Sequence, residues 1–138
     1  NFELKSFDKS LDIKDFDISF ARGLSLEDGC ATVTNFTAYL IAKGIEHANG
    51  NNNDPIKFLV CGGGRKNDYL INSIKSYLSH KQNISLNSID DYSLNGDYIE
   101  SQAFGYLAIR SFLNLPISYP KTTGCIKPTV GGKLAQSF

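Results

Sequence analysis

The pattern of apolar and polar residues predicts a long amphipathic helix in the first half of the chain. Ser25 stands three residues before Asp28, which is typical of a helix N-terminus. Apolar or small residues then recur with the 3.6-residue period of an α-helix. The positions expected on its buried face are Val33, Phe36, Thr37, Leu40, Ile41, Gly44 and Ile45. The polar run 48–55 cannot continue this helix, which is therefore expected to end near His47.

The next segment has the pattern of a strand, a glycine loop, a helix and a second strand. The apolar residues 58–61 show no helical period and are typical of a buried parallel strand. Asn67 is expected to cap the helix that follows. The buried face of this helix is predicted to contain Leu70, Ile71, Ile74, Tyr77 and Leu78. Residues 84–89 predict the second strand, so the segment forms one βαβ unit, with the right-handed connection usual for parallel strands.

The last third of the chain predicts one more helix and a tail. The helix begins at Asp97 to Glu100, and its middle, 103–109, is apolar on nearly all sides. A helix of this kind is expected to be packed on more than one side. Asn114 and Pro116 end it, and the remainder, rich in Pro, Gly and Thr, is expected to form an extended tail over the surface.

These elements place the chain in the α/β class, with a parallel βαβ core flanked by helices. Residues 1–24 have no sustained period and are interpreted as an irregular lead-in with room for one short strand, while residues 25–138 form a part-domain. Two or three strands make a small sheet that depends on packing against something else, so we infer that leading strands are absent. The sequence has no Met, including at position 1, and we expect it to be a piece of a longer protein.

The composition argues against several classes of function. With a formal net charge of zero and no basic block, the chain offers no electrostatic case for binding nucleic acid or an anionic membrane. No apolar run reaches the roughly 20 residues that span a bilayer, and no signal peptide is apparent, so a soluble, cytoplasmic protein is expected. Cys30, Cys61 and Cys125 lack the spacing of a zinc site or a disulfide framework and are expected to be buried free thiols. Neither His47 nor His80 belongs to a cluster of ligands, so no metal site is expected.

The strongest functional signal lies in Gly62, Gly63 and Gly64. Three adjacent residues without a Cβ allow a ligand to touch the main chain, and this loop follows a parallel strand, where open α/β sheets bind their ligands. We therefore predict a nucleotide site. The structural alternative is a tight turn that needs positive φ. Arg65 and Lys66 either steer a phosphate group or form an exposed loop pair.

Two familiar glycine motifs do not fit this loop. The P-loop needs Lys and then Ser or Thr after its last Gly, whereas Arg65, Lys66 and Asn67 follow Gly64. The dinucleotide fingerprint needs a third Gly where Asn67 stands. A dinucleotide-dependent oxidoreductase is therefore the weaker alternative.

Longer stretches of the chain carry a resemblance to a known family. They are VCGGGRKNDYL, NGDYIESQAFGYLAIRSFLNLPISYPKTTGC and the closing VGG, and the match extends back through LSLEDGCATVTNFTAYLIA. These stretches resemble the C-terminal part of the anhydro-N-acetylmuramic acid kinases, members of the actin, Hsp70 and sugar-kinase superfamily. The resemblance implies a partial RNase H-like, actin-like ATPase fold and a reaction of peptidoglycan recycling that uses ATP and Mg²⁺. In that reaction water opens the 1,6-anhydro ring and the sugar is phosphorylated on its 6-oxygen, giving N-acetylmuramic acid 6-phosphate.

The resemblance also implies roles for individual residues. Gly62–Gly64 match the loop that contacts adenosine, and Asn67 matches the position just after it. Glu100 matches an acidic residue that contacts sugar hydroxyls, although Asp97 and Glu100 also have the spacing of a capping box. One carboxylate can serve both purposes.

Other parts of the family pattern have no counterpart in this sequence. They are the phosphate loops, the catalytic Asp that activates water, and the N-terminal lobe. Asp90, Asp91 and Asp97 are expected to be loop and cap residues, so no catalytic residue is assigned and the chain alone is expected to be inactive. The expected partners are the missing lobe and, through exposed apolar surface, a second copy of the chain. The alternative function is that of a non-catalytic remnant or split-gene product that acts as an association module.

Overall fold

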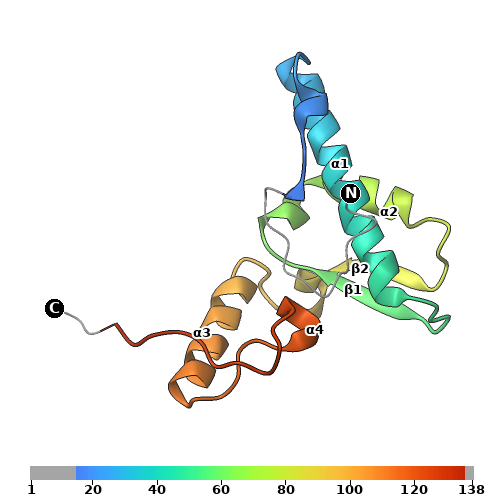
Figure 1. Ribbon diagram of the computed structural model, residues 1–138. Coiled ribbons are helices and arrows are strands. Elements are labelled where there is room, and N and C mark those ends of the chain that lie inside the picture. The colour runs from blue at the N-terminus through green and yellow to red at the C-terminus, as the bar shows by residue number, and fades with distance from the viewer. Residues whose placement is uncertain (1–14, 136–138) are drawn as a thin grey trace. The chain divides into compact units, whose positions relative to one another are not determined.

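The computed structural model describes residues 15–135, which fold into two compact units (Figure 1). One unit spans Ile18–Ile99, and the other contains the described residues from Glu100 onward together with Asp15–Asp17. The helices are α1 (Leu26–Asn49), α2 (Asp68–Tyr77), α3 (Ile99–Phe112) and α4 (Pro120–Thr123), and the strands are β1 (Ile56–Val60) and β2 (Ile84–Ser88). Most of the predicted lead-in, residues 1–24, lies outside the described residues, and its described end contains a 3₁₀ turn at Ser19–Ala21.

Helix α1 is confirmed, but its buried face differs from the predicted one. The Ser25 hydroxyl accepts a hydrogen bond from the Asp28 N–H at 3.1 Å and caps the helix, as the sequence predicts. The buried positions are Ala38, Ala42, Ile45 and Asn49. Ile41, which was predicted to be buried, is 40% exposed. The small alanine side chains allow α2 to approach closely, so the contact follows them rather than the larger residues.

Strands β1 and β2 are parallel and α2 connects them, which confirms the predicted βαβ unit. Their register runs from Ile56 opposite Ile84 to Val60 opposite Ser88. The prediction of a buried strand is only partly correct, because half-buried and exposed residues alternate along β1 and Leu59 is 44% exposed. Both α1 and α2 pack on one face of the sheet, the face that carries Phe58, Ile84 and Leu86 (Figure 1).

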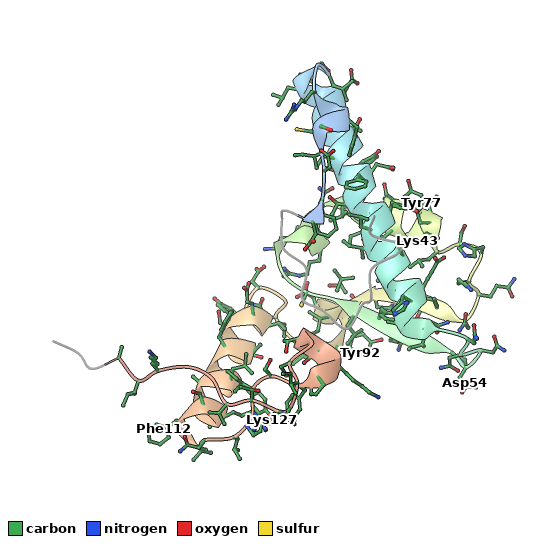
Figure 2. The ribbon with its side chains drawn as sticks, in the orientation of Figure 1. Lys43, Asp54, Tyr77, Tyr92, Phe112 and Lys127 are labelled. Carbon is green, nitrogen blue, oxygen red and sulfur yellow. The ribbon has the colours of Figure 1, made fainter. Side chains whose placement is uncertain are left out.

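The core of this unit lies between α1, α2 and the covered face of the sheet. Its buried residues are Ala38, Ala42, Ile45, Ile74 and Leu78, with Phe58, Leu70, Ile71, Ile84 and Leu86 packed against them. Tyr77, also predicted to be buried, lies instead at the rim of the α1–α2 contact (Figure 2). Its hydroxyl donates to Asn35 Oδ1 at 2.6 Å and its ring meets the Tyr39 ring edge-on. At the rim, the apolar ring of Tyr77 can pack against the helix while its hydroxyl makes this hydrogen bond without being buried.

The unit that begins at Glu100 differs from its prediction in two ways. Helix α3 ends at Phe112, as Asn114 and Pro116 predict, but none of its residues is buried, and Phe112 is 75% exposed (Figure 2). Among residues 15–135, the expected packing of this helix on more than one side is therefore not present. The tail is not simply extended, because it contains α4 and an antiparallel bridge between Ser118 and Thr129.

The cysteines are less buried than predicted. Cys30 and Cys61 are exposed free thiols and Cys125 is half-buried. Cys61 comes directly after the last residue of β1 and so lies beyond the part of the strand that the helices cover. Within residues 15–135, no helix has both the length and the apolar character needed to cross a membrane.

Candidate functional site

The predicted nucleotide loop is a short connection between β1 and α2. Gly62 has φ +77°, and Gly63–Lys66 then form one turn of 3₁₀ helix. Asn67 Oδ1 accepts a hydrogen bond from the Leu70 N–H at 3.0 Å and caps α2, as predicted. The structure therefore brings Gly62, Gly63, Gly64 and Asn67 together in one continuous turn.

Backbone conformation accounts for only one of the three glycines. Gly62 has the positive φ that favours glycine, whereas Gly63 and Gly64 lie in the 3₁₀ turn and do not need it. A Cβ placed on Gly62 or Gly63 would meet no atom within 4 Å, and one on Gly64 would make ordinary contact with Leu70 at 3.5 Å. The main chain at Gly62 and Gly63 therefore borders open space, and the fold itself does not require glycine at 63 or 64.

A network of ion pairs fixes the loop to the segment that follows β2. Arg65 Nε lies 2.5 Å from Asp90 Oδ2, and its Nη1 lies 2.6 Å from Asp97 Oδ1. The Gly62 N–H donates to the Gly96 carbonyl at 2.9 Å, and the Gly96 N–H donates to Asp90 Oδ1 at 2.8 Å. The loop after β1 thus donates the hydrogen bonds that join it to the segment after β2, and the Gly96 N–H holds the Asp90 carboxylate within that second segment.

This network answers one question that the sequence left open, and it shows contacts that the sequence did not predict. The Arg65 side chain is only 7% exposed, so Arg65 and Lys66 are not simply an exposed loop pair. Lys66 is exposed, and its Nζ lies 2.7 Å from Asp97 Oδ2. Asp90 and Asp97 lie between β2 and α3, as expected of loop residues, and they also accept hydrogen bonds from these two cations. Sequence reasoning missed the network because 25 and 32 residues separate Arg65 from its partners. The only available signal was that parallel strands bring their carboxyl ends to the same edge of a sheet.

The network changes the proton affinity of its members. Hydrogen bonds from Arg65, and then from the Gly96 N–H, lower the pKa of Asp90 from its usual 3.8 to about 2. Hydrogen bonds from Arg65, and then from Lys66, lower the pKa of Asp97 by the same amount, to about 2. The two carboxylates in turn raise the pKa of Arg65 above its usual value. All three groups are charged at neutral pH.

Replacing the arginine should return both carboxyl groups toward ordinary acidity. In Arg65→Met we expect the pKa values of Asp90 and Asp97 to rise from about 2 toward 3.8, measured by ¹³C NMR of the carboxyl carbons during an acid titration. Because the folded pKa values are depressed, the network stabilises the fold above pH 4 and loses this contribution as the pH falls from about 4 to about 2. Lys43→Met, which removes a cation that pairs with Glu46, should leave both values unchanged. Values that stay near 2 in Arg65→Met would contradict the assignment.

Glu100 lies apart from the glycine loop in the sequence, and the carboxylates beside the loop are not arranged to hold a metal ion. Glu100 is exposed in the first turn of α3, in the other compact unit, where an acidic side chain also suits the helix dipole. Within residues 15–135, no group of three His, Cys, Asp or Glu side chains is placed to hold a metal ion. The carboxylates that contact the glycine loop, Asp90 and Asp97, are already paired with Arg65 and Lys66, so they do not form a Mg²⁺ site.

The fold and this loop define an α/β protein in which a glycine turn connects a parallel strand to a capped helix. The family model for anhydro-N-acetylmuramic acid kinase matches residues 2–137. The chain belongs to the anhydro-N-acetylmuramic acid kinase family, as the resemblance in the sequence indicates.

Individual relatives agree with this assignment. The chain is 50% identical to the anhydro-N-acetylmuramic acid kinase of Pelagibacter ubique, over 100% of this chain and 37% of that protein. It is 41% identical to the kinase of the same name from Zymomonas mobilis, over 91% of this chain and 33% of the relative. It is 36% identical to anhydro-N-acetylmuramic acid kinase 2 of Jannaschia, over 95% of this chain and 33% of the relative. The chain thus spans about a third of the length of the curated relatives it matches.

Proposed function

We propose that this chain is the C-terminal, nucleotide-binding part of a cytoplasmic, ATP-dependent kinase of peptidoglycan recycling. The substrate is 1,6-anhydro-N-acetylmuramic acid, whose ring is opened by water and whose 6-oxygen receives the phosphoryl group. The adenosine end of ATP lies against Gly62–Gly64, next to Asn67, and Glu100 contacts sugar hydroxyls. The remaining lobe of the kinase completes an RNase H-like domain and the cleft.

The observation that carries this proposal is the open space beside Gly63. A glycine that the backbone conformation does not require, and beside which a Cβ would meet no protein atom, is consistent with a surface kept bare for a ligand. The loop of Gly62–Gly64, called the glycine corner below, lies at the carboxyl end of a parallel strand, where open α/β sheets bind nucleotides. A hollow lined by Val60, Ser88 and Arg65 has a volume of about 200 Å³, which is smaller than the roughly 300 Å³ at the lower end of typical ligand sites. A nucleotide would therefore lie in the open space beside the glycine corner and not in this hollow.

The same loop supplies binding rather than proton transfer. A general base works best when its pKa is near the operating pH, whereas the carboxylates of Asp90 and Asp97 have pKa values of about 2 and are paired with cations. The base and the phosphate loops are therefore assigned to the rest of the kinase. Mg²⁺ remains a cofactor of the complete reaction, but no step is assigned to it here because these residues do not form its site.

Nucleotide binding without turnover is the result expected of the chain by itself. Calorimetry should detect ADP binding to the 138-residue chain, and ADP should bind more tightly than NAD. Adding ATP, Mg²⁺ and the anhydro sugar should give no phosphorylated sugar by mass spectrometry. Phosphorylated product would show that the chain carries its own base, and tighter binding of NAD would favour the oxidoreductase alternative.

A second candidate is a non-catalytic association module. The observation in its favour is the exposure of large apolar side chains in α3 and directly after it, namely Phe104, Ile109, Phe112 and Leu113. Surfaces of this kind mark contacts with other chains, including a second copy. Absence of ADP binding, together with a dimer in analytical ultracentrifugation, would favour the module over the nucleotide-binding part.

A further inference from the structure

The side chain of Arg65 is placed to control the shape of the glycine loop. Its guanidinium donates to the Gly62 carbonyl at 2.9 Å while the same group contacts Asp90 and Asp97. Arg65 is therefore bonded to the first glycine of its own loop and to two acidic residues beyond β2. The Asp90 carboxylate is held in turn by the Ser88 hydroxyl at 3.1 Å and by the Gly96 N–H.

Gly96 provides a second, independent observation: the space that the Arg65 guanidinium occupies is available only because residue 96 has no Cβ. Gly96 is buried, and a Cβ built on it would lie 2.5 Å from Arg65 Nε and 2.8 Å from its Cζ. Real Cβ atoms do not approach other heavy atoms this closely. The φ of Gly96 is not in the positive range that favours glycine, so space for the guanidinium, rather than backbone conformation, requires glycine there.

The loop needs an external support of this kind. Glycine loses more conformational freedom on ordering than any other residue, and Gly62–Gly64 are three in succession with open space beside two of them. A loop left free to move would have to be ordered at the moment of binding, and the ligand would bind correspondingly less tightly. The planar guanidinium of Arg65 binds two carboxylates and a carbonyl at once, so it orders the loop before the ligand arrives. A lysine, which acts as a point charge, does not hold its partners in a fixed geometry in this way.

We propose that Arg65 is a positioning residue of the nucleotide site, which holds Gly62–Gly64 in the shape that receives the nucleoside and does not bind the phosphates itself. This inference rests on the proposed function. All guanidinium nitrogens already donate to protein oxygens, so the charge is neutralised within the network. The expected ligand of the supported main chain is the uncharged nucleoside portion.

Adenosine and ADP together test this inference. In Arg65→Met, calorimetry at a temperature where the variant is folded should show about tenfold weaker binding of adenosine and of ADP alike, because the loop has lost its shape rather than a phosphate contact. Hydrogen exchange at the amides of residues 62–66 should become faster without ligand. Gly96→Ala keeps the charge of Arg65 but displaces its guanidinium, so it should have the same two effects. Lys43→Met is the control for loss of a cation and should change neither measurement.

The outcomes separate this inference from the proposed function. Loss of ADP affinity with unchanged adenosine affinity would overturn the positioning role and make Arg65 a phosphate ligand. Unchanged affinities for both ligands in Arg65→Met and Gly96→Ala would also overturn it. If the wild-type chain binds neither ligand, the proposed function fails. The faster exchange in the variants would still show that Arg65 orders the loop. If Arg65→Met does not fold, Gly96→Ala alone decides.

Discussion

Gly63→Val is expected to abolish ADP binding while the chain stays folded. A Cβ at Gly63 meets no protein atom within 4 Å, and the residue does not have a positive φ, so the free protein can accept a larger side chain there. In the complex, the valine would occupy the volume proposed for the nucleoside. We expect at least about a 100-fold loss of affinity, or roughly 2.7 kcal/mol, measured by calorimetry.

The matched control for this variant is Gly105→Val. Gly105 lies in α3, and a Cβ there also meets no atom within 4 Å, so the same substitution is made at a second position with open space for the side chain. Its ADP affinity should equal that of the wild type, and circular dichroism should show both variants folded. If Gly63→Val binds ADP as tightly as Gly105→Val does, the nucleoside does not lie against the glycine corner.

Ile74→Ala should give the largest loss of stability. Ile74 is 2% exposed and lies in the small core between α1 and α2. Truncating a buried isoleucine removes apolar burial and leaves a cavity, which costs about 2–5 kcal/mol. This is a large part of the free energy of unfolding of a typical domain, which is roughly 5–15 kcal/mol. The measurement is urea unfolding followed by circular dichroism.

The control for Ile74→Ala is the same substitution at an exposed position of α1. Ile41→Ala should cost less than about 1 kcal/mol, because Ile41 is 40% exposed and alanine is the better helix former. Comparable losses in both variants would show that the contact of α1 follows the larger residues predicted from the pattern, and not the line through Ala38 and Ala42.

Local chemistry explains why much of the fold was predictable. Ser25 and Asn67 were expected to cap α1 and α2, and both do, because a capping side chain bonds to an N–H only three residues away. The βαβ unit was predictable for a similar reason, since short apolar runs and a 3.6-residue period identify strands and helices without knowledge of their neighbours. The loop with Gly62–Gly64 lies in the predicted place between them.

Packing explains the predictions that were wrong. The periodicity of α1 identified a face, but the choice of Ala38 and Ala42 as its centre depends on how closely α2 can approach. The sequence of β1 was compatible with burial on both faces, and the arrangement of α1 and α2 on a single face left Leu59 exposed. Cys61 was expected to be buried for the same reason and is exposed.

The amino-acid sequence by itself determined the order of the elements, their caps, the position of the glycine turn and the family, because each of these depends on neighbouring residues or on direct similarity. Only the tertiary structure decided that positive φ explains Gly62 but not Gly63, and that Arg65 pairs with Asp90 and Asp97. Contacts between residues 25 and 32 positions apart arise when parallel strands bring their ends together, and no local pattern records which side chains then meet.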